Sequence, residues 1–202
     1  DFLAQCPSLK VIAAALKGYD NFDVDACARR GIRFSIIPDL LTEPTAELAV
    51  ALLLGIGRNI LPGDRLVRSG EFHGWRPVLY GAGLAGATIG IVGMGAIGRA
   101  VALRLKGFGS RLLYADPLSL EQAQEEAFCV TRHSLENLLD QSDFVLVTAP
   151  LTPQTRHIIN STKLATMKPG AFLVNIGRGS VVDEAAVAEA LASGHIAGYA
   201  AD

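Results

Sequence analysis

Cysteine is scarce in this chain of 202 residues, and the cysteines that occur lie far apart. Cys6, Cys27 and Cys129 are odd in number and include no CxxC pair. This spacing excludes a disulfide framework and offers no zinc site. We therefore expect free, small, buried apolar side chains in a reducing compartment, and no bound metal.

A charge excess and a long hydrophobic run are also missing. The 18 Lys and Arg residues nearly balance the 20 Asp and Glu residues, and the basic ones are scattered. This pattern argues against a nucleic acid or an anionic membrane as partner. The most apolar helical stretch, residues 46–61, is interrupted by Glu47 and Arg58 and is too short to cross a bilayer. No signal peptide is visible, so we expect a cytoplasmic protein.

Apolar residues make up 50% of the chain, enough for a large core. From residue 88 onward, apolar strands alternate with amphipathic helices, which predicts a doubly wound parallel α/β (Rossmann) sheet. The strands are expected at 88–92, 111–115, 143–148, 171–176 and 196–201. The helices are expected near 97–107, 120–127, 134–141, 160–167 and 183–192, with Ser134 and Asp183 as N-caps.

A smaller α/β pattern comes first, with strands at 9–14 and 33–37 and a helix at 23–30. We interpret residues 1–40 as the end of a smaller, flavodoxin-like substrate domain and residues 41–202 as the dinucleotide-binding domain. A helix over 45–61 follows Pro44. Because neither end has the polar composition usual at termini, we expect an internal piece of a longer protein, truncated at the C-terminal end of this domain.

The most informative motif is Gly93-x-Gly95-x-x-Gly98, which follows a strand and opens a helix. The first glycine permits a tight turn, the second lets backbone approach a pyrophosphate, and the third lets helix and strand pack closely. Phosphate oxygens would then meet the N–H groups around Ala96 and Ile97 at the positive end of the helix dipole.

Asp116 ends the next strand, eighteen residues after Gly98. An acid at this distance accepts hydrogen bonds from an adenosine ribose. No arginine follows directly in Pro117-Leu-Ser119 to receive a 2′-phosphate, so the pattern favours NAD over NADP. In the alternative interpretation, Asp116 only caps a loop.

Arg178 lies in a Gly-rich turn after the strand predicted at 171–176. Ligands of open α/β sheets bind beyond that edge, and a guanidinium there can hold an anion through two hydrogen bonds. The alternative is a surface arginine that satisfies a loop carbonyl.

Several blocks together resemble the D-isomer-specific 2-hydroxyacid dehydrogenase family, from about residue 9 to 202. The blocks are GYDNFD (18–23), PTAEL (44–48), GIVGMGAIG (90–98), PLTPQT (150–155) and NIGRGSVVD (175–183). Within the family, ALKGYDNFDVDAC (15–27), PDLLT (38–42) and RSGEFHGW (68–75) resemble the phosphite-oxidising members, the phosphonate dehydrogenases. The resemblance implies an NAD-dependent oxidoreductase and assigns Arg178 the role of anchoring the substrate.

The same resemblance places Lys17 at the substrate cleft, although a lone lysine is more often solvated. Phosphite is largely a dianion, and two cations, Lys17 and Arg178, suit a dianion better than a 2-hydroxy acid. The first hypothesis is therefore oxidation of phosphite to phosphate. The alternative is a D-2-hydroxyacid dehydrogenase that reduces 2-keto acids, and a third possibility is a non-catalytic NAD-sensing module.

Further roles follow from the resemblance alone. It implies cofactor contacts by Thr45, Gly93, Gly95, Ala96, Ile97, Gly98, Asp116, Pro117, Pro150, Thr155, Asn175, Ile176, Arg178 and Asp202. Trp75 and Tyr80 match aromatics near the substrate, and they fit equally well as plain core or interface residues. The family's catalytic Glu and His would follow Asp202, so we expect this chain alone to bind NAD weakly and to lack turnover. A homodimer through residues 45–84 is also expected.

Overall fold

The computed structural model describes residues 2–202 and contains two compact units, Asp1–Pro44 and Thr45–Asp202. The division falls close to the boundary expected after residue 40. Unit 1 contains α1 (Phe2–Gln5), β1 (Val11–Ala13), α2 (Val24–Arg29) and β2 (Arg33–Ser35). Strands β1 and β2 pair in parallel, with Ile12 opposite Phe34. This is the α/β pattern predicted for the first unit, with shorter strands.

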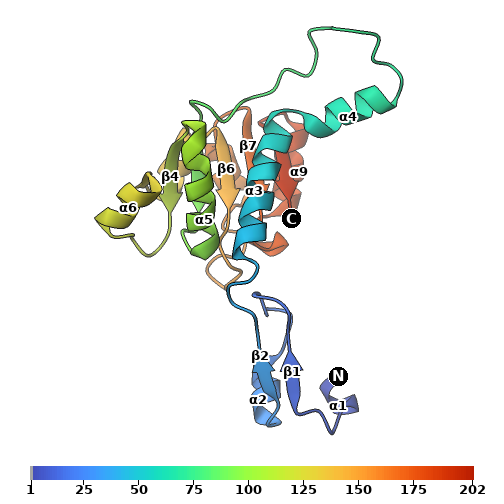
Figure 1. Ribbon diagram of the computed structural model, residues 1–202, viewed down its shortest axis with the longest axis vertical. Helices are drawn as coiled ribbons and strands as arrows, with labels where there is room; N and C mark the ends of the chain where they lie inside the picture. Colours follow the sequence, from blue (N-terminus) through green and yellow to red (C-terminus); the bar gives the residue numbers. More distant parts are fainter. Residues whose placement is uncertain (1) are drawn as a thin grey trace. The chain divides into compact units, whose positions relative to one another are not determined.

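Unit 2 is built on a parallel sheet with the strand order β5-β4-β3-β6-β7-β8. The chain runs outward from β3 to one edge and then crosses back to build the other half (Figure 1). The strands are β3 (Thr88–Val92), β4 (Arg111–Ala115), β5 (Val130–Arg132), β6 (Phe144–Val147), β7 (Ala171–Asn175) and β8 (Ile196–Ala201). The predicted Rossmann fold is thereby confirmed.

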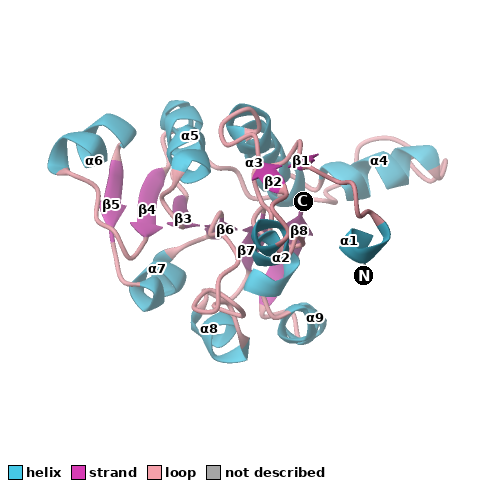
Figure 2. Ribbon diagram, turned by 90° about the horizontal axis from the view of Figure 1, so that it is seen from below, coloured by secondary structure: helices cyan, strands magenta, loops and turns pink. Residues whose placement is uncertain are grey.

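Helices cover both faces of this sheet. The α-helices that follow α2 are α3 (Thr42–Gly57), which begins in the last residues of unit 1, and α4 (Ile60–Arg68), α5 (Ala96–Leu105), α6 (Gln122–Phe128), α7 (Leu135–Gln141), α8 (Ser161–Thr166) and α9 (Glu184–Ala192). Figure 2 shows α3 and α5 on one face and α7, α8 and α9 on the other. Each face has its own buried cluster, one around Leu53 and Val101 and the other around Leu138 and Val187. Because both faces of the sheet are covered, the sequences of its strands are continuous runs of apolar residues.

Local signals set several helix starts as predicted. The Ser134 hydroxyl accepts a hydrogen bond from the Asn137 N–H, and the Asp183 carboxylate accepts one from the Ala186 N–H. Gly194 follows α9 with a φ of +73°, the left-handed conformation common after a helix.

Two elements differ from the sequence-based expectation. Helix α4 occupies part of a stretch expected to be loop, because Asn59 adopts a left-handed φ of 54° and starts a second helix at an angle to the first. Strand β5 was also missed. It has only three residues and depends on pairing with β4, in which Arg132 lies opposite Tyr114.

The structure also bears on the expectations for the cysteines and for a membrane-spanning helix. Cys27 is buried, as expected, whereas Cys129 is exposed at the left-handed C-cap of α6, so the expectation of burial was wrong for Cys129. All three cysteines are free. Within residues 2–202, no single helix is long and apolar enough to cross a membrane, although α3 and α4 together would pass that test despite a 62° bend.

Asp143, just before β6, contacts the start of β3 and Lys168 through its carboxylate. Its Oδ2 accepts a hydrogen bond from the Thr88 N–H at 2.8 Å, and its Oδ1 lies 2.9 Å from the Lys168 ammonium. Partial burial raises the pKa of this carboxyl, but the Thr88 N–H and Lys168 together outweigh burial and lower the pKa below its usual value.

Replacing Asp143 with Ala is expected to lower the free energy of unfolding by about 1 kcal/mol at neutral pH, because the Thr88 N–H loses its acceptor. Lys168→Ala removes only a half-exposed ion pair and should cost about 0.5 kcal/mol or less. The pKa of Asp143 is lowered by folding, so its contribution is present above its unfolded pKa and is lost as the pH falls through its folded pKa. Urea unfolding of both variants tests this. An equal deficit for Asp143→Ala at neutral pH and below the folded pKa would contradict it.

Candidate functional site

The Gly-rich loop turns the chain from β3 into α5 by bringing backbone against backbone. Gly93 has a φ of +99°, and a Cβ there would lie 2.9 Å from the Ala149 nitrogen. A Cβ on Gly98 would lie 2.4 Å from the Gly93 carbonyl oxygen. These two glycines are therefore required by the fold itself.

Gly95 differs from its neighbours in the loop. A Cβ built on it meets no atom of the described residues within 4 Å. Gly95 is the N-cap of the ten-residue helix α5 and offers no side chain to its first N–H groups. Ala96 is exposed and Ile97 half-buried in that first turn. Open space in front of uncapped N–H groups at a helix N-terminus fits a pyrophosphate.

Asp116 joins the end of β4 to the Gly-rich loop. Its Oδ2 accepts a hydrogen bond from the Met94 N–H at 2.7 Å, and its Oδ1 accepts one from the Leu118 N–H at 2.9 Å. It therefore does cap its own loop, as the alternative interpretation proposed. Because an ionised carboxylate has about four acceptor positions, room remains for the hydroxyls of a ribose.

The segment after Asp116 is hydrogen-bonded to a buried tyrosine, Tyr114. The Tyr114 hydroxyl donates to Glu125 Oε1 at 2.7 Å and accepts a hydrogen bond from the Leu120 N–H at 2.9 Å. Burial, together with the bond to the Glu125 carboxylate, raises the pKa of this phenol. Tyr114 therefore stays neutral and fixes where the loop from Asp116 to Leu120 lies.

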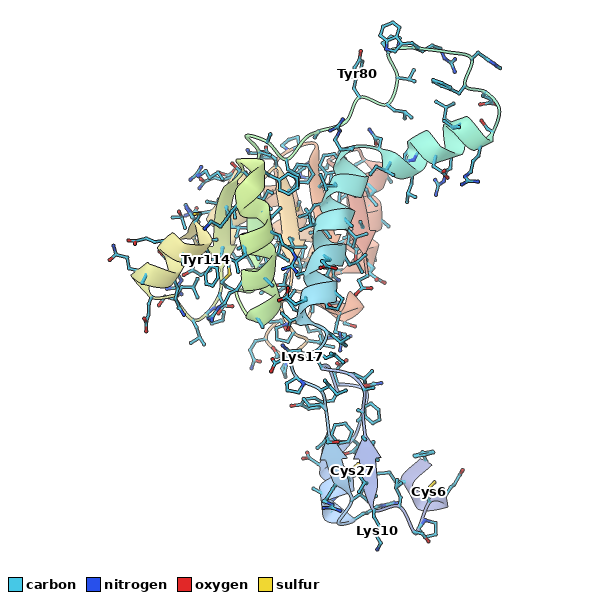
Figure 3. The ribbon with its side chains drawn as sticks, in the orientation of Figure 1. Cys6, Lys10, Lys17, Cys27, Tyr80 and Tyr114 are labelled. Atoms are coloured by element: carbon cyan, nitrogen blue, oxygen red, sulfur yellow. The ribbon has the colours of Figure 1, made fainter. Side chains whose placement is uncertain are left out.

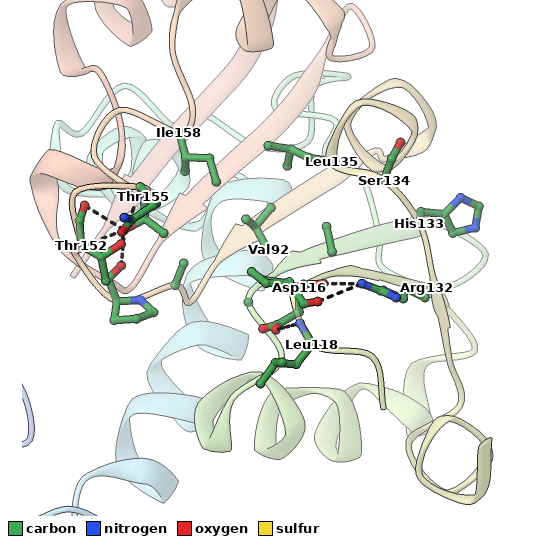
Figure 4. A pocket seen from close by; sticks show the side chains of 16 residues that line it. Val92, Asp116, Leu118, Arg132, His133, Ser134, Leu135, Thr152, Thr155 and Ile158 are labelled. Carbon is green, nitrogen blue, oxygen red and sulfur yellow. Dashed lines mark hydrogen bonds between the residues drawn. The ribbon is translucent and has the colours of Figure 1, made fainter. Parts of the chain in front are cut away.

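A cavity of about 970 Å³ opens at the carboxyl ends of the strands, between the Gly-rich loop, Asp116 and the loop after β6 (Figure 4). Five residues predicted to contact the cofactor line it: Gly93, Asp116, Pro117, Pro150 and Thr155. Other residues that line the cavity were not predicted from the sequence, among them Arg132, His133, Ser134 and Thr152. Recognising β5 would have identified the first three, because they lie at its end or directly after it.

The wall formed by the loop after β6 is held by hydrogen bonds within the loop. The Thr155 hydroxyl lies 2.5 Å from the Pro150 carbonyl oxygen, and the Thr152 N–H donates to the Thr155 hydroxyl oxygen at 2.8 Å. Figure 4 shows these threonines gathered on the side of the cavity across from Asp116. Thr155 thus holds the loop as well as lining the cavity.

Arg178 sits in a turn that Asn175 holds in place. Asn175 is 3% exposed; its Oδ1 accepts from the Gly177 N–H at 3.0 Å, and its Nδ2 donates to the Arg178 carbonyl at 2.9 Å. The Asp202 N–H donates to the Asn175 carbonyl. The Arg178 side chain is exposed just past β7, with Nη1 3.2 Å from the Gly177 carbonyl oxygen. Ile176, predicted to line the groove, is 5% exposed within the apolar cluster around Leu53.

The remaining predicted residues are spread over both units. Lys17 is half-buried in unit 1, in the turn after β1, and Thr45 is half-buried in the first turn of α3. Lys17 and Arg178 therefore belong to different units.

Trp75 and Tyr80 lie on the segment after α4 and are 84% and 79% exposed. The Asn59 amide donates to the Tyr80 carbonyl, which ties that segment to the end of α3. Figure 3 shows Tyr80 beyond the edge where the strands begin, opposite the carboxyl ends that carry Arg178. Within unit 2, the structure does not bring these aromatics to the cavity.

Comparison with known proteins matches this geometry to one family. The model of the D-isomer specific 2-hydroxyacid dehydrogenase NAD binding domain matches residues 50–202. A glyoxylate reductase of Thermococcus litoralis is 44% identical over 207 residues, covering 100% of this chain and 62% of that protein.

Two solved structures superpose closely. The TT0316 protein from Thermus thermophilus has a TM-score of 0.91 at 41% identity, covering 99% of this chain and 62% of that one. D-lactate dehydrogenase from Aquifex aeolicus, complexed with NAD and lactic acid, has a TM-score of 0.88 at 31% identity, covering 99% and 59%. The chain thus spans about 60% of the length of these relatives. It belongs to the D-isomer specific 2-hydroxyacid dehydrogenase family and contains that family's NAD-binding domain.

Proposed function

We propose that the protein reduces a small 2-keto acid of the glyoxylate class with NADH and oxidises the corresponding D-2-hydroxy acid in the reverse direction. The observation that carries this proposal is the Arg178 turn. One guanidinium stands at the carboxyl end of β7, on backbone that buried Asn175 fixes. One permanent cation matches the single carboxylate of such a substrate, and the planar guanidinium can bind both of its oxygens.

The relatives support the same substrate class. The T. litoralis relative is named as a glyoxylate reductase, and the A. aeolicus structure holds lactic acid with NAD. Both names refer to small monocarboxylic acids. Because this chain spans about 60% of those proteins, the activity is proposed for the whole protein and not for the chain alone.

The chain's own residues would divide the work of binding. The first turn of α5 would hold the pyrophosphate, Asp116 the adenosine ribose, and Arg178 the substrate carboxylate. When bound, NADH supplies the hydride that adds to the keto carbon. Fixed positioning of the two reactants then lowers the barrier, because little orientational freedom remains to be lost.

Reduction of a carbonyl also needs a proton on the new hydroxyl oxygen. Two histidines of unit 2 lie outside the Arg178 turn. The His195 Nε2 lies 3.0 Å from the Leu164 carbonyl oxygen, and His133 lines the cavity that Asp116 also lines. We propose that the proton comes from the His that the family resemblance places after Asp202, oriented by the Glu that the resemblance places before it. The 202-residue chain would then bind NAD without turnover.

Phosphite oxidation is the competing assignment. It would need Lys17 beside Arg178 to balance a dianion, and its support is the resemblance of the peptides around Lys17 and Trp75. The names of the relatives described above give it no support. Pure NAD sensing is a weaker candidate, because a sensor needs no arginine held at the substrate edge.

A homodimer is proposed through α4 and the segment that follows it. Helix α4 exposes Ile60, Leu61 and Val67 at 56%, 64% and 63%, and Trp75 on the next segment is 84% exposed. Apolar surface of this extent is typical of an interface.

Gly95 and Gly98 of the Gly-rich loop allow cofactor binding to be tested separately from folding. Gly95→Ala is expected to weaken NADH binding about tenfold or more while leaving the melting temperature nearly unchanged, because its Cβ would occupy space proposed for the pyrophosphate. Gly98→Ala should lower the melting temperature by several degrees, because its Cβ would contact the Gly93 carbonyl. Titration of NADH fluorescence and thermal unfolding measure the two effects. A Gly95→Ala protein with wild-type NADH affinity would contradict the placement.

Arg178→Leu is expected to lower kcat/KM for glyoxylate by about 100-fold or more, because the substrate carboxylate loses a charged partner that binds through two hydrogen bonds. NADH affinity should change little. Arg178→Lys should recover only part of the activity, since an ammonium cannot reproduce the planar pair of donors. Steady-state kinetics of the full-length protein provide the measurement, and undiminished turnover in Arg178→Leu would refute the role.

Lys17→Ala distinguishes the two substrates. In a 2-keto acid reductase it should change kcat/KM for glyoxylate by less than about tenfold, since Arg178 alone balances the substrate charge. In a phosphite oxidase it should abolish most phosphite-dependent NADH formation. Both assays use the full-length protein, and turnover of phosphite that depends on Lys17 would replace the proposed function with phosphite oxidation.

A further inference from the structure

The ribose end of the cavity contains an arginine that the sequence argument for NAD did not consider. The residues directly after Asp116 in the sequence include no arginine. The structure brings Arg132, the last residue of β5, to the same loop. The Arg132 Nη2 donates to the Asp116 carbonyl at 3.0 Å and to the Pro117 carbonyl at 3.1 Å. Figure 4 shows this guanidinium reaching across to the loop.

The register of the sheet explains why the two residues meet. Arg132 lies opposite Tyr114 in the parallel pair β4–β5, and Asp116 follows two residues after Tyr114. The carboxyl ends of neighbouring parallel strands share one edge, so a long side chain at the end of β5 reaches the loop leaving β4. Both residues line the cavity.

Two nitrogens of the Arg132 guanidinium, Nε and Nη1, donate no hydrogen bond within residues 2–202. Both of its hydrogen bonds within residues 2–202 come from Nη2, and it pairs with no carboxylate of that part of the chain. A guanidinium carries five N–H donors in a planar fork, so Nε and Nη1 remain for a ligand. Both parallel donor pairs of a guanidinium include Nη2, so Nε and Nη1 would contact a ligand as single charged donors, and the positive charge of Arg132 favours an anion such as a phosphate monoester.

The Asp116 carboxylate opposes the binding of a phosphate at this point. It lines the same cavity and already accepts the Met94 and Leu118 N–H groups as an anion. A phosphate on the ribose 2′-oxygen would stand beside this fixed negative charge, which repels it. The free 2′-hydroxyl of NAD can instead donate to the carboxylate.

We propose that Arg132 is a specificity-determining residue for the dinucleotide: it forms a latent site for a 2′-phosphate that the charge of Asp116 keeps closed. Neutralising Asp116 opens this site, and NADPH binding then depends on the Arg132 guanidinium. In the wild-type protein Arg132 positions the loop from Asp116 to Leu118 through its two carbonyl contacts.

The test measures dissociation constants for NADH and NADPH in the full-length protein by the fluorescence of the bound nicotinamide. The variants Asp116→Ser and Asp116→Asn are each compared with the same variant carrying Arg132→Leu. Asn is included because its side-chain oxygen can still accept the Met94 N–H. Arg111→Leu is the matched control: it removes the same charge from an exposed residue at the opposite, amino end of β4.

The ratio of NADPH to NADH affinity is expected to rise about tenfold or more in the Asp116 variants, since a charge-assisted contact replaces a repulsion. Adding Arg132→Leu should cancel most of that rise, while Arg111→Leu leaves it in place. Arg132→Lys should retain part of it. The gain should shrink at high salt, because the contact is ionic and partly exposed.

Two results would overturn the proposal. One is an unchanged affinity ratio in both Asp116 variants. The other is an equal loss of NADH and NADPH binding when Arg132 is removed, which would mean that Arg132 only supports the loop. Because the readout is binding without substrate, it fails or succeeds independently of the proposed 2-keto acid reduction.

Discussion

Direct contact of backbone with backbone at the Gly93–Gly98 loop is the constraint on which the site depends. Gly98 lies against the Gly93 carbonyl, and the Thr148 hydroxyl donates to that same carbonyl at 2.6 Å. This packing seats the N-terminus of α5 over the end of β3 and opens the space before Gly95. The space proposed for the pyrophosphate is therefore shaped by backbone.

Around that fixed point, the cavity is held by hydrogen bonds from its own walls. Asp116 connects the Gly-rich loop to the segment after β4, while Tyr114 and Arg132 hold that segment at further points. The residues Asp116 and Arg132 both line the resulting cavity. The proposed cofactor specificity rests on the balance between these two charges and not on one residue.

The turn that carries Arg178 is likewise held by hydrogen bonds. Buried Asn175 uses both ends of its amide to shape the turn that carries Arg178. The backbone of this turn is held by these hydrogen bonds, whereas the Arg178 side chain is exposed. The family relationship and the Arg178 guanidinium are the basis of the proposed monocarboxylic substrate.

The sequence alone determined the α/β alternation, the strand–Gly-rich loop–helix unit, Asp116 and the Arg178 turn, because these depend on local patterns of apolar residues, glycine and helix caps. Strand β5, the bend at Asn59 and the meeting of Arg132 with Asp116 could not be predicted in this way. A three-residue strand has too little pattern of its own, and Arg132 and Asp116, sixteen residues apart in the chain, come together only through the register of β4 with β5. Local chemistry thus fixed the elements, and long-range strand pairing decided which charges share the cavity.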